Sequence, residues 1–387
     1  MLHASPSSPP FSSAPAPDAP CDLLGGLSPA QFMRRHWQKK PLLIRNAIPG
    51  FAPLLTRQQL FDMAAEEAVE SRLIVRKPQG WTLKQGPLTR QQLPPLRQPG
   101  WTLLVQGVDQ HMDAAHALLQ RFRFVPDARL DDLMISWASD AGGVGPHFDS
   151  YDVFLLQATG QRRWLIGRQK DFSLQPGVPL KILSHFEPEE EHVLNPGDML
   201  YLPPRWAHDG DAVGVDCSTY SIGFRAPQRG GLAGELLQRM ADELDDDTLF
   251  RDPGQAATAT PAAMPAALEA FAVDALQRLL AERQSLACAL GEVMTEPKPR
   301  IWFDEPDGDW TLGALRLDRR TRMMYDDRHI FINGESFRAG GADARLMRAL
   351  ADQRGLDQRQ VVRASEGAQA LLQDWFDAGW LHRVEPA

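Results

Sequence analysis

The sequence predicts an α+β protein built around a central β structure, with helical segments before and after it. Short apolar runs at close spacing, bounded by turn residues, fill residues 133–224 and predict a barrel or sandwich. Beyond residue 226 apolar residues recur at helical spacing, and from residue 299 short strands alternate with helices. A chain of 387 residues is long enough for two or three such domains.

Composition narrows the class of protein. Hydrophobic residues make up 43% and charged residues 24%, as in ordinary soluble globular proteins, and neither a membrane-spanning stretch nor a secretory signal is found. The net charge of −9 argues against nucleic-acid binding and is compatible with a basic protein substrate. Cys21, Cys217 and Cys288 are far apart, which argues against a disulfide framework. We therefore expect a cytoplasmic protein.

The segments flanking the central region can be assigned in order. Residues 1–20 are rich in Pro, Ser and Ala and are expected to be disordered. Ser28, followed by Pro and then by Gln31, predicts a helix start, and Thr56 predicts another. Strands are predicted at residues 41–45, 71–76 and 101–106, and a helix at 112–122. This αβ lead-in is expected to pack against the outside of the central sheet.

The C-terminal third divides into a helical part and a mixed part. Leucines recur at helical spacing on both sides of a Pro/Ala/Thr-rich linker at residues 252–265, which predicts two amphipathic helices. Asn333-Gly lies between apolar runs and predicts a turn. The last residues, 368–384, have the pattern helix, glycine turn and strand, which is typical of a winged-helix-like module. No helix there is marked as a basic recognition surface.

Three candidate metal ligands stand within the β region. His147 and Asp149 are two residues apart at the start of an apolar run, so in a strand both side chains point to one face. His208 follows a Pro-Gly-Asp turn and a Pro-Pro pair. Two imidazoles and one carboxylate with open positions form the ligand set of non-haem Fe(II) oxygenases. His185 and His192 lie in a Glu-rich loop and are expected to be solvated.

The motifs around these residues resemble a known family. Leu133-Met-Ile-Ser-Trp precedes Gly142-Gly-Val-Gly-Pro-His-Phe-Asp-Ser-Tyr-Asp-Val-Phe, and Ser221-Ile-Gly-Phe-Arg-Ala-Pro closes the region. Their order and spacing resemble the Jumonji C branch of the 2-oxoglutarate oxygenases. They are most similar to the bacterial ribosomal oxygenases that hydroxylate an arginine of large-subunit ribosomal protein sixteen. The resemblance extends loosely over most of the chain after the first twenty residues.

This resemblance implies a fold, an activity and partners. Residues 21–226 would form a double-stranded β-helix, the cupin-like jelly roll, with its αβ lead-in. Residues 227–298 would be helical and pair two subunits in a homodimer, and residues 299–387 would form the winged-helix-like module. The implied reaction hydroxylates a ribosomal protein at the β-carbon of an arginine. It uses Fe(II), 2-oxoglutarate and O2, and releases succinate and CO2.

The distal carboxylate of 2-oxoglutarate needs a cation, and two arginines follow the metal-binding run. A two-residue hairpin turn at Thr159-Gly160 pairs Gln157 with Arg162. Gln157 shares the parity of the metal ligands, which turns Arg162 toward the metal and Arg163 away from it. The family pattern also has its cofactor-binding basic residue here. A guanidinium suits this role because its planar fork binds a carboxylate through two hydrogen bonds.

Other polar residues are candidates for the pocket. Ser136, Thr219 and Ser221 are predicted to contact the co-substrate, although hydroxyls also often bond to neighbouring backbone groups. Thr219 and Ser221 share one face of their strand, but the glycines after the last histidine ligand leave its relation to the metal open. Asp140 and Tyr151 are candidate contacts for the protein substrate, Asp140 as an acceptor for a guanidinium. An exposed aspartate in a loop is also commonly just solvated.

The residues leave other functions open. The same machinery could act on a histidine or asparagine of another protein, or demethylate a lysine. A cupin-like binding module without turnover is a further alternative, against which the intact triad and Arg162 argue. A DNA-binding regulator acting through residues 299–387 is disfavoured by the acidic balance.

Overall fold

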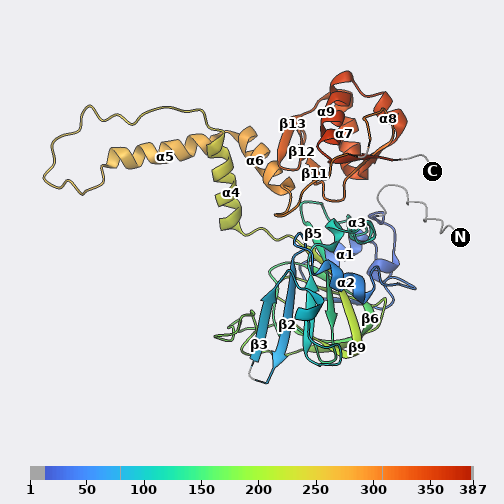
Figure 1. Cartoon of the computed structure of the whole chain (residues 1–387). Helices are drawn as coiled ribbons and strands as arrows, with labels where there is room; N and C mark the ends of the chain where they lie inside the picture. The colour runs from blue at the N-terminus through green and yellow to red at the C-terminus, as the bar shows by residue number, and fades with distance from the viewer. Residues whose placement is uncertain (1–13, 79, 307, 385–387) are drawn as a thin grey trace. The chain divides into compact units, whose positions relative to one another are not determined.

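A computed structural model describes residues 14–78, 80–306 and 308–384, and the chain divides into two compact units after Ala226 (Figure 1). Most of the segment expected to be disordered, residues 1–13, lies outside the described residues. Within that description, no helix is long and apolar enough to cross a membrane.

The N-terminal unit contains one large antiparallel sheet, and the strands of the predicted αβ lead-in are part of this sheet, so the expectation that the whole lead-in packs against its outside is wrong. Ser28 and Thr56 each cap a helix through a reciprocal capping box, which confirms both predicted helix starts. The helices are α1 Pro29–Arg35, α2 Arg57–Met63 and α3 Asp113–Gln120. The strands are β1 Leu42–Ile44, β2 Ser71–Lys77, β3 Gly80–Gln85, β4 Trp101–Val105, β5 Leu130–Ala138, β6 Val153–Gly167, β7 Glu190–Leu194, β8 Met199–Leu202 and β9 Ala207–Phe224.

The strand order places β6 and β9 at the centre of the unit. The nine strands follow the order β1-β8-β6-β9-β5-β4-β2-β3, with β7 also paired to β6. In Figure 1, β6 and β9 lie side by side, and β9 pairs with β5 on its other edge. One face of β6, with Phe154 and Leu156, packs into the main core with the lead-in helices. We call the opposite face, which carries Leu155 and Arg162, the inner face. This arrangement confirms the predicted jelly roll.

The predicted hairpin at Thr159-Gly160 is wrong. β6 continues through this point from Val153 to Gly167, and its register with β9 shifts on both sides of Thr159. Gly160 has a φ of 62°, a left-handed conformation that suits glycine. A local Thr-Gly signal fits a tight turn or a bulge equally well. Here the neighbouring long strand β9 keeps β6 in the sheet, so the irregularity becomes a bulge.

The C-terminal unit has its own core and contains the predicted helices and winged-helix-like module. Asn333 and Gly334 both have positive φ and join β12 to β13, which confirms the predicted turn. Three-stranded sheets form in the orders β14-β10-β15 and β11-β12-β13. The elements are α4 Arg229–Asp242, α5 Ala266–Ala281, α6 Arg283–Thr295, β10 Leu315–Leu317, β11 Met323–Tyr325, β12 His329–Ile332, β13 Glu335–Arg338, α7 Gly341–Gln353, β14 Gly355–Leu356, α8 Gln358–Val362, α9 Glu366–Asp377 and β15 Leu381–Arg383.

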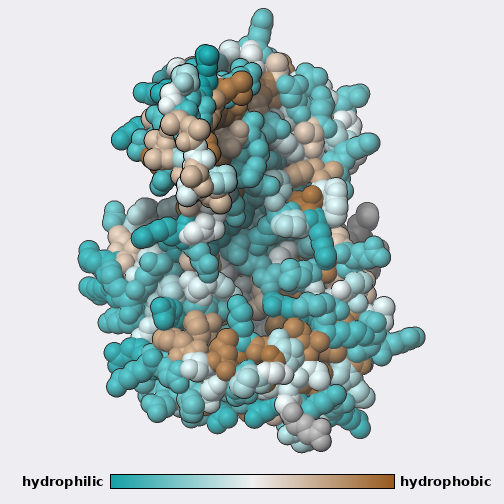
Figure 2. All heavy atoms as spheres, turned by 90° about the vertical axis from the view of Figure 1, so that its left-hand side faces the viewer, coloured by the Kyte–Doolittle hydropathy of each residue, from teal (hydrophilic) through white to brown (hydrophobic). Residues whose placement is uncertain are grey.

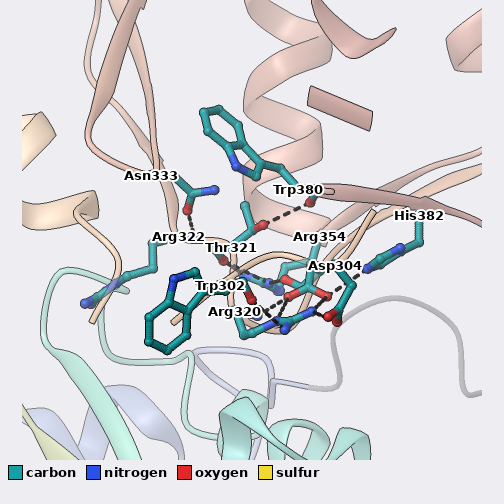
Figure 3. Close-up of polar contacts among 10 residues, drawn as sticks. Trp302, Asp304, Arg320, Thr321, Arg322, Asn333, Arg354, Trp380 and His382 are labelled. Carbon is teal, nitrogen blue, oxygen red and sulfur yellow. Dashed lines mark hydrogen bonds and ion pairs between the residues drawn. The ribbon is translucent and has the colours of Figure 1, made fainter. Parts of the chain in front are cut away.

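A buried carboxylate, Asp318, joins segments of the C-terminal unit that are distant in sequence, because it contacts both Arg320 and His382. Figure 3 labels these two partners. Asp318 is 2% exposed and accepts hydrogen bonds from Arg320 Nε at 2.8 Å and His382 Nε2 at 2.7 Å. Arg320 also reaches Asp304 at 2.8 Å. Burial alone would raise the pKa of Asp318, but the hydrogen bonds from His382 and Arg320 outweigh it and hold that pKa well below its usual range. Asp318 is therefore ionised at neutral pH.

Replacing Asp318 with asparagine should lower the free energy of unfolding of this unit by about 3 kcal/mol, because Arg320 would lose its buried charged partner. Hydrogen exchange over α9 and β15 would measure the change. Asp377→Asn, at an exposed position at the end of α9, serves as the control and should change the free energy of unfolding by less than about 0.5 kcal/mol. Equal protection in the two variants would contradict a stabilising role for the Asp318 network.

Candidate functional site

The structure brings the three predicted metal ligands together. One ligand atom from each of His147, Asp149 and His208 lies within 4.8 Å of the others, and within the described part of the chain no other such group is found. His208 lies near the start of β9. His147 and Asp149 lie in the segment between β5 and β6, which is not a regular strand. Instead, His147 forms an isolated antiparallel bridge with His208.

This bridge fixes the spacing of the two imidazoles. The His147 amide donates to the His208 carbonyl at 3.0 Å, and the His208 amide donates to the His147 carbonyl at 2.8 Å. Each ring is then oriented by its own Nδ1, which lies 2.9 Å from the carbonyl of Gly145 or Trp206. A proton on Nδ1 leaves the Nε2 lone pair of both rings for a metal ion.

The carboxylate completes the arrangement. Asp149 Oδ2 lies 3.6 Å from His208 Nε2, and the Asp149 carbonyl accepts a hydrogen bond from the Arg205 amide at 2.7 Å. Burial and the neighbouring His147 lower the pKa of His208 to about 4. His208 is therefore neutral at physiological pH, as a metal ligand must be.

Glycines allow the loop before the triad to lie flat against β9. A Cβ on Gly143 would come within 2.7 Å of the Gly210 carbonyl, so a side chain at that position would collide with the strand backbone. The Gly142-Gly-Val-Gly run therefore serves the close approach of His147 to His208.

Arg162 faces the interior, as predicted. It is 3% exposed and pairs with Ala212 of β9, and its Nε and Nη2 atoms are buried without a hydrogen-bond partner in the described part of the chain. Arg163 has a side chain that is 44% exposed, and it forms ion pairs with Asp211 and Glu191. A buried guanidinium without an anionic partner is costly, so the Arg162 wall offers a binding site for a carboxylate.

The structure also connects the last strand to the metal side. Along β9, Ala212 shares the face of His208. Ala212 packs with Cys217, and Cys217 shares the parity of Thr219 and Ser221. Thr219 and Ser221 therefore lie on the same inner side as the metal ligands. The sequence could not show this, because β9 changes parity between Ala212 and Cys217.

Two of the predicted hydroxyls already donate within the sheet. Thr219 Oγ1 donates to Gln157 Oε1 at 2.9 Å, and Ser136 Oγ donates to the Thr219 carbonyl at 3.3 Å. Gln157 Nε2 donates in turn to the Thr159 carbonyl at 2.8 Å. Gln157 was not among the predicted pocket residues. Its parity with Thr219 across the β6–β9 pair is the signal that could have identified it.

The two predicted substrate contacts differ in position. Desolvation of the Tyr151 hydroxyl and the nearby Asp149 carboxylate raise the pKa of Tyr151. Asp140 instead lies beside the far part of β9, where its Oδ1 accepts a hydrogen bond from the Gly214 amide at 2.8 Å. Gly214 lies six residue steps along β9 from His208, roughly 20 Å. The structure therefore brings Tyr151 to the triad and does not bring Asp140 there.

A jelly roll with two imidazoles and one carboxylate on its inner side, and a buried arginine on the same side, defines the class of mononuclear non-haem iron oxygenases. Comparison with known proteins specifies the branch. Residues 117–232 match the family model of the JmjC domain, and residues 278–382 match that of the ROXA-like winged helix.

Two curated relatives carry related names. The chain is 37% identical over 256 residues to the ribosomal protein uL16 3-hydroxylase of Escherichia coli, covering 65% of this chain and 66% of the relative. It is 36% identical over 231 residues to a probable ribosomal oxygenase of Haemophilus influenzae, covering 59% of this chain and 55% of the relative. These alignments thus leave a third or more of each relative unmatched.

Solved structures match over nearly the whole chain. A structure of the E. coli ribosomal oxygenase YcfD in complex with cobalt and 2-oxoglutarate has a TM-score of 0.78 and 28% sequence identity, covering 91% of this chain and 97% of that one. An X-ray structure of E. coli YcfD has a TM-score of 0.81 at the same identity and coverage. The chain belongs to the Jumonji C family and resembles its ribosomal oxygenases in both of its domains.

Proposed function

We propose that the protein is a 2-oxoglutarate- and Fe(II)-dependent hydroxylase of a ribosomal protein. The observation that carries the proposal is the pairing of the His147, Asp149 and His208 triad with the unpaired, buried guanidinium of Arg162. One group of atoms suits a divalent metal, and the other suits a carboxylate. A 2-oxo acid with a second carboxylate at its far end can occupy both.

The residues present fit the metal and the co-substrate. His147 and His208 offer neutral nitrogen ligands and Asp149 offers an oxygen, a set that iron(II) and cobalt(II) both accept. When bound, the iron supplies the oxidation of a C–H bond by O2, coupled to loss of CO2 from 2-oxoglutarate. The protein orients the ligands, holds the co-substrate at Arg162 and excludes side reactions. No protein nucleophile is required.

The proposed substrate is large-subunit ribosomal protein uL16, at the β-carbon of an arginine. The support is the 37% identity over 256 residues to the E. coli uL16 3-hydroxylase, together with the JmjC match at residues 117–232. The net charge of −9 favours a basic ribosomal protein over nucleic acid as the partner. We propose that the reaction takes place in the cytoplasm, where ribosomal proteins are made, without direct binding of nucleic acid.

Succinate release from 2-oxoglutarate and Fe(II), with and without a uL16 peptide, would test this function. We expect the peptide to stimulate turnover and to gain the mass of one oxygen atom on an arginine. Turnover that the peptide does not stimulate would support the oxygenase activity and exclude uL16 as the substrate. Absence of turnover in protein that binds both metal and 2-oxoglutarate would favour a binding module.

We also propose that the protein acts as a homodimer through its helical segment. On α5, Val273, Leu276 and Leu280 are each about half exposed, whereas Leu279 packs in a small core with Met240 of α4. Figure 2 shows that hydrophobic atoms gather in patches among hydrophilic ones on one side of the molecule. A second copy would cover this apolar helix face. Sedimentation of the full chain would test the proposal.

A further inference from the structure

A second unpaired donor lies on the same wall as Arg162. Trp164 is 4% exposed, and its indole Nε1 is buried without a hydrogen-bond partner in the described part of the chain. Buried N–H groups almost always have a hydrogen-bond partner, so the missing partner of the Trp164 indole needs a structural or functional reason. Trp164 lies two positions after Arg162 on β6, which places both on the inner face.

The indole of Trp164 lies near both the metal ligand His208 and Arg162. Its ring lies 5.7 Å from the guanidinium carbon of Arg162 and 5.8 Å, centre to centre, from the imidazole of His208. Opposite it on β9 stands Gly210, where an added Cβ would come within 2.5 Å of the six-membered ring. The missing side chain at Gly210 allows the indole to lie against the strand, between the metal ligands and Arg162.

The chemistry of a carboxylate explains why two residues would share it. A carboxylate accepts about four hydrogen bonds, and Arg162 presents Nε and Nη2, the two donors of one edge of its fork. Acceptor capacity therefore remains after the arginine is bound. The hydroxyls of Ser136 and Thr219 cannot fill it in this arrangement, because both already donate within the sheet.

We infer that the indole N–H of Trp164 donates a hydrogen bond to the distal carboxylate of the co-substrate beside Arg162. The inference rests on the proposed function, since it needs a 2-oxo dicarboxylate in the pocket. It assigns Trp164 to co-substrate binding, a role distinct from its packing against the apolar residues Leu155, Ile166 and Leu194 of the same wall.

Trp164→Phe removes the N–H and keeps an aromatic ring. In the cobalt(II)-loaded full chain, which binds the co-substrate without turnover, we expect a dissociation constant for 2-oxoglutarate about 10-fold higher by calorimetry, the value of one hydrogen bond to a charged group. Metal affinity should stay the same. With 2-oxovalerate, which has a methyl group in place of the distal carboxylate, wild type and variant should bind equally.

Trp375→Phe is the matched control. Trp375 is also buried, at 2% exposure, with an unpaired Nε1, but it lies in the core of the C-terminal unit. This substitution should leave 2-oxoglutarate affinity unchanged. In wild-type protein labelled with ¹⁵N-tryptophan, the indole resonance that is missing from Trp164→Phe should move downfield when 2-oxoglutarate is added.

The outcomes separate the inference from the proposed function. Unchanged 2-oxoglutarate affinity in Trp164→Phe, or an equal loss of affinity for 2-oxoglutarate and 2-oxovalerate, would contradict the hydrogen bond from Trp164. Neither result would contradict the proposed oxygenase function. An indole resonance that does not move in wild type would contradict the hydrogen bond as well, even if the variant fails to fold. Failure of the wild-type protein to bind 2-oxoglutarate at all would overturn the proposed function itself.

Discussion

Replacing His208 with alanine should lower metal affinity by more than about 100-fold and abolish turnover. Loss of even an outer-shell partner of a metal ligand typically costs 10–100-fold, and His208 is a candidate ligand itself. Its pKa of about 4 means that protons compete for this nitrogen only in acid. Below about pH 4, the metal affinity of the wild-type protein should therefore also fall as the pH is lowered. Calorimetry with cobalt(II) and succinate release with Fe(II) would measure both effects.

The control for this variant is His185→Ala. The side chain of His185 is 77% exposed and lies within 3.4 Å of Asp171, outside the triad. Its loss should leave metal affinity and turnover unchanged. If His208→Ala retained wild-type affinity for cobalt(II), the triad assignment would fail. Thermal unfolding of the metal-free proteins would show whether the variant has lost its fold instead of its ligand.

Replacing Arg162 with alanine should raise the dissociation constant for 2-oxoglutarate by at least about 100-fold while metal affinity stays the same. Removal of one partner from a buried, hydrogen-bonded charge pair costs about 2–5 kcal/mol, because the remaining charge stays buried and unpaired. Arg162→Lys should recover part of the affinity, since lysine retains the charge but not the planar fork. Titration of the cobalt(II)-loaded variants would give these values.

Arg163→Ala offers a matched control for Arg162. The two arginines are adjacent, but Arg163 points to the opposite side of β6 and pairs with Asp211 and Glu191. We expect the loss of the Arg163 side chain to change 2-oxoglutarate affinity by less than about 2-fold, because it removes only exposed ion pairs, which contribute little free energy. Equal losses in Arg162→Ala and Arg163→Ala would mean that general charge, and not a specific carboxylate contact, attracts the co-substrate.

Local patterns predicted much of this molecule. The capping boxes at Ser28 and Thr56 and the Asn333-Gly334 turn depend on neighbours within a few residues, so the sequence was sufficient for them. The triad could be anticipated because His147 and Asp149 are two residues apart and the order of ligands matches a known family. Their shared position, however, comes from a backbone bridge and not from the regular strand that the spacing predicted.

Pairing between strands that are distant in sequence explains the features that the sequence analysis did not predict. The Thr159-Gly160 turn was predicted from local chemistry, but β9 runs beside β6 through this point and keeps it extended. Asp140 precedes the glycine loop in sequence, yet the loop carries the chain along β9 before it reaches the metal ligands. Trp164 was open to prediction, since it lies two residues after Arg162 and so shares its face.

The reciprocal backbone bridge between His147 and His208 has a consequence for how the protein is made. The two imidazoles come from parts of the chain that are far apart in sequence, and only the pairing of β9 with the earlier segment sets their spacing. A growing chain therefore cannot offer the complete ligand set until β9 has left the ribosome. Once it has, the ligands are already in place and the ion needs little further ordering of the chain. Iron loading should thus be a late event in biosynthesis that follows folding.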